Sequence, residues 1–267
     1  MNSKDYQGMF YISSHWLISC LISPAECWRK YLDPNRPVQE TTDAMRFGTL
    51  VHCLMLTPKM FEQEFLVADF ERKSMIGKTH YTELLATGKI IVKPGEIKKA
   101  KTIITALKAN SEARKLLTAG SKEITLVKPR EIGLLPLKAR LDVLNKKNKM
   151  VVEFKTTYSL RAIETAIERY RYLLSASFYM HLSKSTCFKF VFVQTSEPYE
   201  IAILDVSKEQ LQNGKEQWQA ALKKFDDCWK TNYWPEAEIT PKVDSENDTV
   251  YYTPRKYYDI PVGEIRI

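Results

Sequence analysis

The chain has 267 residues, of which 44% are hydrophobic and 27% are charged, and its formal net charge is +8 at pH 7. This length and composition allow a full hydrophobic core, which excludes wholesale disorder and removes the need for a disulfide or metal staple. No run approaches the roughly 20 apolar residues of a membrane span, the first residues do not resemble a signal peptide, and the five scattered cysteines are typical of a soluble protein in a reducing compartment.

The first part of the chain is predicted to be helical. Residues 11–31 are expected to form two short helices, the second capped by Ser23 and begun by Pro24. Residues 43–56 are expected to form a mostly buried helix that ends before Pro58.

The following segment changes character. Residues 61–85 are mixed, with a loop expected near Gly77, and residues 90–92 are expected to form a short strand. Residues 94–117 are predicted to form one helix, because apolar residues recur at i, i+3 and i+4 while lysines occupy the other face.

A central β-meander is predicted after Gly120, where the sequence takes the period of strands. The order of elements predicts an α/β domain over residues 1–236, in which a central mixed β-sheet is flanked by helices, and an extended C-terminal tail over 237–267. The predicted strands are 123–128, 135–145, 150–157, 188–194 and 199–206, and the predicted helices after Gly120 are 159–169, 172–182 and 207–231.

Positive charge is concentrated between Glu71 and Arg130, where 14 basic and 5 acidic residues give a surplus of nine. A field of one sign attracts polyanions such as nucleic acid. A solvated helix face explains the same charges, so the charge pattern leaves both interpretations open.

Two predicted strands carry charged residues among apolar ones. Asp142 lies in the first, and Glu153 and Lys155 lie in the second, where the period of two places them on one face. A hairpin brings Asp142 opposite or diagonal to Glu153. Buried carboxylates are costly unless they are paired or hold a metal, so the pattern favours a catalytic or metal site. An exposed Glu–Lys pair is the alternative.

Gly48 and His52 share one face of the helix over 43–56, and glycine lets that face approach another backbone closely. A histidine among apolar neighbours is often a core residue, but beside a carboxylate pair it becomes a candidate metal ligand. Glu123 and Arg140 could support such a site, although surface charge is the simpler interpretation for Glu123.

These residues resemble the PD-(D/E)xK nuclease core, and the ordered series of motifs is similar to RecE-type exonucleases (exonuclease VIII) over about residues 10–236. The resemblance implies a restriction-endonuclease-like α/β core. The motifs that carry it are Phe47–Pro58, Gly77-Lys78, Leu137–Asp142, Val151–Thr157, Tyr170–Tyr179, Phe190–Val193 with Pro198-Tyr199, and Asn232–Pro235.

The resemblance implies that His52, Asp142, Glu153 and the backbone carbonyl of Phe154 hold one or two Mg²⁺ ions, for which Mn²⁺ would substitute. It assigns Lys155 to orienting the attacking water or stabilising the transition state. Iron–sulfur relatives of this superfamily need a set of four cysteines that the chain does not match, so no cluster is expected.

One position departs from the family, because Ser175 stands where RecE-type enzymes usually have Gln. Tyr172 and Tyr179 share its helical face, so Ser175 and Tyr179 are catalytic candidates, with ordinary helix-to-sheet packing as the alternative for the tyrosines. The candidate DNA-contacting residues are Arg140, Arg169, Arg171, Tyr172, Lys98, Lys99 and Lys101.

The resemblance implies a Mg²⁺-dependent 5′→3′ exonuclease that degrades linear double-stranded DNA to give 3′ overhangs for phage or prophage recombination. It also implies a RecT-like annealing partner, a tetrameric ring and a place in the cytoplasm of a bacterial host cell. The alternatives are a catalytically impaired DNA-end-binding or scaffold protein on the same fold, and an endonuclease of the same superfamily.

Overall fold

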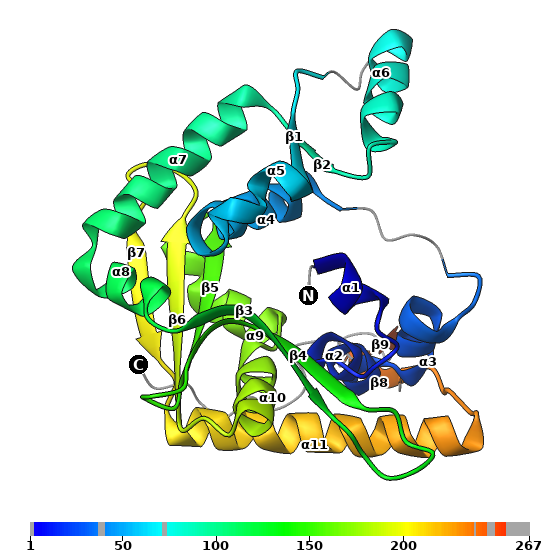
Figure 1. Cartoon of the computed structure of the whole chain (residues 1–267). Coiled ribbons are helices and arrows are strands. Elements are labelled where there is room, and N and C mark those ends of the chain that lie inside the picture. Colours follow the sequence, from blue (N-terminus) through cyan, green and yellow to red (C-terminus); the bar gives the residue numbers. More distant parts are fainter. Residues whose placement is uncertain (1–2, 37–40, 71–73, 238, 245–248, 255–267) are drawn as a thin grey trace.

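A computed structural model of the chain describes residues 3–36, 41–70, 74–237, 239–244 and 249–254. Its centre is a five-stranded sheet in the order β3-β4-β5-β6-β7 (Figure 1), in which β5 and β6 are parallel and the other neighbours are antiparallel. The predicted α/β class with a mixed sheet is confirmed. The strands are β3 (Ser121–Lys128), β4 (Leu137–Asn145), β5 (Met150–Thr157), β6 (Cys187–Gln194) and β7 (Ile201–Asp205).

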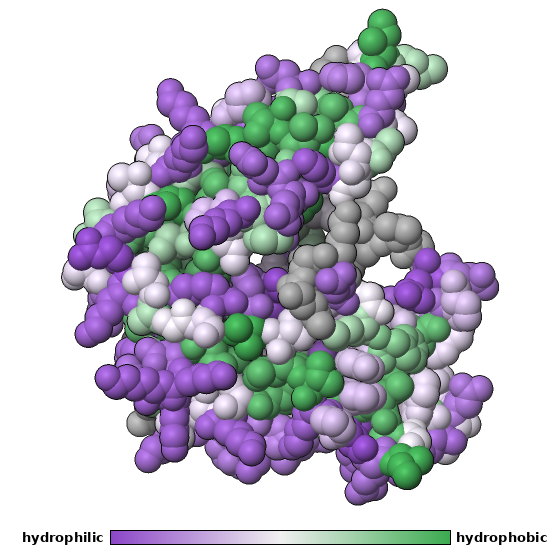
Figure 2. Space-filling model, in the orientation of Figure 1, coloured by the Kyte–Doolittle hydropathy of each residue, from purple (hydrophilic) through white to green (hydrophobic). Residues whose placement is uncertain are grey.

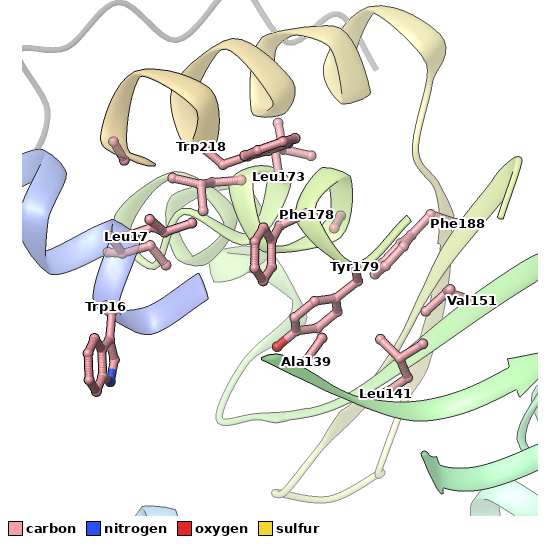
Figure 3. Packing of buried hydrophobic residues seen from close by; sticks show 14 of the residues in the cluster. Trp16, Leu17, Ala139, Leu141, Val151, Leu173, Phe178, Tyr179, Phe188 and Trp218 are labelled. Carbon is pink, nitrogen blue, oxygen red and sulfur yellow. The ribbon is translucent and has the colours of Figure 1, made fainter. Parts of the chain in front are cut away.

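Helices cover both faces of the sheet. One face packs against α2, α9, α10 and α11 through a cluster that includes Leu141, Phe178, Tyr179 and Trp218 (Figure 3). The other face packs against α4, α7 and α8. The bounds are α2 (Ser14–Ile22), α4 (Asp43–Leu56), α7 (Pro94–Ala109), α8 (Ser111–Thr118), α9 (Ile163–Arg169), α10 (Tyr172–Ser183) and α11 (Lys208–Thr231).

Side-chain caps fix the ends of several helices where the sequence predicts them. The Ser23 hydroxyl accepts a hydrogen bond from the Glu26 N–H at the start of α3, and the Thr42 hydroxyl accepts one from the Met45 N–H at the start of α4. Ser207 caps α11 in the same way, through the Gln210 N–H. The predicted helices at 43–56 and 207–231 are therefore confirmed to within a residue.

Two predictions about the basic segment are wrong. Residues 94–117 form two helices, because Asn110 adopts extended backbone and its side chain caps α8 through the Ala113 N–H. Gly77 lies inside α6 and not in a loop, because the Ser74 hydroxyl accepts from the Gly77 N–H and places this glycine in the first turn.

Short elements complete the described chain. Part of the expected extended tail forms an antiparallel pair, β8 and β9. No helix in the described ranges is long and apolar enough to cross a membrane. These elements are α1 (Ser3–Gly8), α3 (Pro24–Cys27), the π-helix η1 (Trp28–Leu32), η2 (Pro58–Met60), α5 (Phe61–Glu64), β1 (Phe65–Val67), α6 (Met75–Leu85), β2 (Ile90–Val92), η3 (Leu160–Ala162), β8 (Ile239–Asp244) and β9 (Thr249–Pro254).

Strands β4 and β5 pair only next to their connecting turn, where Asn145, Leu144 and Val143 face Met150, Val151 and Val152. Beyond Val143 and Val152 no further ladder pair joins the two strands, although β5 continues to pair with β6 as far as Thr157. We call this point of separation the fork. It determines where the charged side chains of both strands meet.

Candidate metal and catalytic site

Asp142 stands at the fork, one residue beyond the last β4–β5 pair. The backbone N–H of Phe154 donates a 2.7 Å hydrogen bond to Asp142 Oδ2, so a side chain takes the place of the next ladder bond. Asp142 is 9% exposed, and Glu153, the residue across the fork, is 7% exposed. The hairpin predicted from the sequence therefore brings both carboxylates to one buried position.

His52 reaches this position from α4. A Cβ added to Gly48 would lie 3.2 Å from Oγ1 of Thr156 on β5, so glycine permits the close approach of the helix to the sheet. One turn later, His52 Nδ1 lies 3.7 Å from Asp142 Oδ1, and its ring centroid lies 4.7 Å from that of Phe154.

Glu123 joins the same group from β3. The pairs Lys122↔Val143 and Ile124↔Leu141 flank it, so the register places Glu123 across from Asp142. Ligand atoms of His52, Glu123 and Asp142 all lie within 4.8 Å of one another, an arrangement that could hold a metal ion.

The surface-charge interpretation of Glu123 is therefore corrected. Its side chain is half-buried, and its Oε2 accepts a 2.6 Å hydrogen bond from Arg140 Nε. The sequence could have indicated this role, because β3 and β4 are consecutive strands and their antiparallel register sets Glu123 opposite Asp142. The left-handed backbone of Glu123, with φ of 49°, could not have been predicted from the sequence.

Lys155 and Glu153 form an ion pair on β5. Lys155 Nζ lies 2.5 Å from Glu153 Oε1, and the ammonium sits 5.4 Å from the centroid of the Tyr172 ring. The second oxygen, Glu153 Oε2, is buried without a hydrogen-bond partner among the described residues. A buried carboxylate oxygen in this state is a strong candidate for a cation ligand.

The electrostatics of the group favour a bound cation. Burial raises the pKa of Asp142 to about 7, and burial together with the Asp142 charge raises the pKa of Glu153 to about 7. Burial and the Lys155 charge lower the pKa of His52 to about 4, which keeps its imidazole neutral and able to bind a metal. Burial lowers the pKa of Lys155, but the negative charges of Glu153 and Asp142 have the larger combined effect. The pKa of Lys155 is therefore raised.

The donor set fits a hard divalent cation. Carboxylate oxygens from Asp142, Glu153 and Glu123 and a neutral imidazole from His52 are ligands that Mg²⁺ and Mn²⁺ accept. A cation held by His52, Glu123 and Asp142 would offset the cost of ionising clustered carboxyl groups.

Helix α10 places its candidates at different depths. Tyr172 contacts Lys155, as described above. The Tyr179 hydroxyl accepts a 3.4 Å hydrogen bond from Ser14 Oγ, and burial followed by the Glu153 charge raises its pKa. Ser175 is half-buried on the same helix.

The candidate DNA-contacting cations do not form one group. Arg140 lies at the site, bound to Glu123, whereas Arg169 is exposed on α9. Arg171 is 3% exposed, so a direct surface contact with DNA does not fit its position. The three candidate lysines of α7 are exposed, on the outer side of the helix, where Figure 2 shows hydrophilic residues. They are Lys98, Lys99 and Lys101.

Comparison with known proteins places the chain in a family. The family described as "PDDEXK-like domain of unknown function (DUF3799)" matches residues 13–244, which is most of the chain. A search of curated proteins gave no significant match. The resemblance to PD-(D/E)xK proteins that the motifs predict is thereby confirmed.

Two solved structures are similar to the chain. A protein of Eubacterium rectale named "Putative exonuclease" matches with a TM-score of 0.65 and 14% identity, covering 99% of each chain. A "phage related exonuclease" of Haemophilus somnus matches with a TM-score of 0.36 and 12% identity, covering 86% of this chain and 100% of that one. At these identities the first similarity shows a shared fold alone, and the second carries no weight.

Proposed function

The chain belongs to the PDDEXK-like family DUF3799, and from this premise we propose that it is a divalent-metal-dependent DNA nuclease whose site is the fork. The observation that carries the proposal is the meeting of Asp142, Glu153 and Lys155 at one buried position, with a carboxylate oxygen of Glu153 left without a partner. Ion-pair networks that only stabilise a fold satisfy their buried oxygens, whereas a catalytic metal site leaves them for the ion.

His52, Asp142, Glu153 and the Phe154 carbonyl would hold Mg²⁺, or Mn²⁺ in its place, and Glu123 would contribute a further oxygen. When bound, such an ion acidifies a water molecule and neutralises charge on the scissile phosphate. The residues of the chain prepare this chemistry, because the Phe154 N–H fixes the Asp142 carboxylate and burial excludes bulk water.

Lys155 would orient the attacking water or stabilise the extra negative charge of the pentavalent phosphorus. Its ion pair with Glu153 and the ring of Tyr172 fix the ammonium beside the carboxylates, and its raised pKa keeps it charged at neutral pH. Tyr179, with its hydroxyl held by Ser14, would line the same space. The Ser175 hydroxyl would supply only part of the hydrogen bonding that the longer amide side chain of Gln offers.

The finer assignment is a 5′→3′ exonuclease that acts on linear double-stranded DNA and leaves 3′ overhangs for recombination. It is supported by the RecE-type motifs and by exposed lysines on α7 that could attract the DNA backbone. On the same basis we propose a RecT-like annealing partner, a ring of four subunits, residues 1–236 as the nuclease domain, and a cytoplasmic location in a bacterial host cell.

The test uses purified protein and linear duplex DNA labelled at one 5′ end. We expect release of labelled mononucleotide with Mg²⁺, none with EDTA, and loss with Lys155→Ala. Lys147→Ala, in the exposed β4–β5 turn, is the matched control and should leave release unchanged. Release from the 3′ end first would overturn the polarity and keep the nuclease.

Two further outcomes would identify the alternatives. Cleavage of covalently closed circles by the unaltered protein would indicate an endonuclease. Tight binding of duplex ends without any cleavage in Mg²⁺ or Mn²⁺ would indicate a binding or scaffold protein, for which the Ser175 position would be the first suspect.

A further inference from the structure

The N-terminal segment occupies the edge of β4 that β5 leaves free beyond the fork. Ile12 pairs with Leu137 in parallel orientation. The Ile12 N–H donates to the Pro136 carbonyl at 2.9 Å, and the Lys138 N–H donates to the Ile12 carbonyl at 2.8 Å. Ile12 is fully buried, so this segment is a built part of the fold and closes the open end of the fork.

Helix α1 continues from this segment onto the face of β4 that carries the site. Leu137, Ala139 and Leu141 face the core under α2 and α10, so the alternate residues Lys138 and Arg140 face the other way, toward Asp142. In Figure 1, α1 lies over β4 between α4 and α2.

Lys138 anchors α1 at this place. Its ammonium donates to the backbone carbonyls of Tyr6 at 2.8 Å and Met9 at 2.7 Å, and it lies 4.6 Å from the centroid of the Tyr6 ring. Lys138 is only 4% exposed, so these carbonyls are its main partners. A cation bound to the last carbonyls of a short helix stabilises its C-terminal end.

The anchored helix places Tyr6 against Lys138, on the site-bearing face of β4. Burial raises the pKa of the Tyr6 phenol. The Arg140 charge lowers this pKa and the Glu153 charge raises it, both less strongly than burial. Burial raises the pKa of Tyr179, and the charges of Glu153 and Tyr6 raise it further. Lys138, Arg140 and Asp142 occupy alternate positions of β4, so the Tyr6 ring that contacts Lys138 lies on the face of the strand that carries Asp142.

A nuclease that cuts inside a continuous strand needs an open path on both sides of the scissile phosphate, whereas one that cuts at a terminus needs a path on one side only. We propose that α1, through Tyr6 and its anchor Lys138, forms a wall at one side of the catalytic carboxylates that confines cleavage to DNA ends. This inference rests on the proposed function and assigns Tyr6 as a specificity-determining residue.

The test compares the unaltered protein with Tyr6→Ala and with the chain lacking residues 2–9, using closed circular and linear DNA of one sequence. We expect the ratio of circular to linear cleavage to rise by at least about tenfold in both variants, while cleavage of linear DNA persists. Gln7→Ala, exposed on the same helix, is the control and should keep the original ratio. Retained linear cleavage with an unchanged ratio in both variants would overturn the wall.

A binding measurement separates this inference from the proposed activity. In this measurement Ca²⁺ replaces Mg²⁺, and each protein first binds a linear duplex with a fluorescent 5′ end. Circular DNA is then added as the competitor that displaces the duplex. The wall predicts that circles displace it poorly from the unaltered protein and at least about tenfold better from Tyr6→Ala. If the unaltered protein cleaves nothing, the proposed activity fails, but this competition still decides the wall; equal displacement from both proteins overturns it.

Discussion

Gly48 on α4 and Thr156 on β5 lie so close that a Cβ on the glycine would be 3.2 Å from the threonine Oγ1. This contact sets the depth at which α4 rests on the sheet, and His52 follows one turn later on the same face of the helix. The missing Cβ thus lets α4 approach β5 closely at the turn that precedes His52.

Gly48→Ala should therefore weaken metal binding without unfolding the protein. Overpacking of this kind costs roughly 1–3 kcal/mol, partly relieved by a small movement of α4. We expect a few-fold to tenfold lower affinity for Mn²⁺ by calorimetry. Thr156→Ala removes the opposing oxygen, so the double variant should recover most of the loss; no recovery would show that the contact does not set the helix position.

Asp142→Asn and Asp142→Ala should separate structure from chemistry. The amide oxygen of Asn can still accept from the Phe154 N–H, so the fork survives while the charge is lost. We expect both variants to lose at least about a hundredfold in cleavage. Only Ala should lower the free energy of unfolding, by about 1–3 kcal/mol, because it leaves the amide unpaired. Equal unfolding free energies, measured in urea with EDTA, would contradict this role of the hydrogen bond.

Glu153 should make the metal-free protein less stable as the pH rises. Its folded pKa, about 7, lies above its ordinary value of 4.5, so the folded state holds the proton more tightly. Its contribution is fully present below pH 4.5 and is lost as the pH rises through 7.

Glu153→Gln should consequently match the unaltered protein at pH 4.5 and be more stable at pH 8 by on the order of 1–3 kcal/mol in EDTA. Mg²⁺ should remove or reverse the difference, because the ion favours the carboxylate. Thermal unfolding across this pH range measures both effects, with Glu164→Gln, on the exposed side of α9, as control. A difference that shrinks with rising pH would refute this account.

Glu123 and Arg140 should have opposite effects on metal affinity. Glu123→Gln removes a proposed ligand and should weaken Mn²⁺ binding by about tenfold or more. Arg140→Gln releases the Glu123 carboxylate from its ion pair and should strengthen binding in the absence of DNA. Calorimetry on both variants tests the pair, and an unchanged affinity in Glu123→Gln would exclude this residue as a ligand.

The lysines of α7 should contribute to DNA affinity through salt-dependent attraction. Replacing Lys98, Lys99 and Lys101 together by Ala should lower the slope of log affinity against log salt by up to about 3, at roughly 0.9 per phosphate contact. The control replaces Lys223, Lys224 and Lys230 on α11, which covers the other face of the sheet. Equal slopes for the two variants would remove α7 from the DNA-binding surface.

Local signals predicted much of the fold. The end of the helix at 43–56 was marked by a proline, and the strands around Asp142 and Glu153 were marked by alternation and a polar turn. The short polar turn between these two strands predicted that they pair as a hairpin. The position of Asp142 near Glu153 could therefore be predicted from the sequence.

The remaining features depend on contacts that the sequence does not encode locally. Helix α6 shows no apolar periodicity because none of its residues is buried, and the short α1 is held by Lys138, more than a hundred residues away. Glu123 belongs to the candidate site through the β3–β4 register and an uncommon left-handed backbone, and Arg171 is buried although Arg169 and Tyr170 before it are exposed.

The hydrogen bond between the Phe154 amide and Asp142 gives the site a spectroscopic reporter on the main chain. An amide proton shared with a carboxylate senses the charge on that carboxylate, so its NMR shift should follow protonation and ion binding at Asp142. Because the same strand continues into Lys155, this one backbone resonance would report from between Asp142, the proposed metal ligand, and Lys155, the proposed phosphate contact.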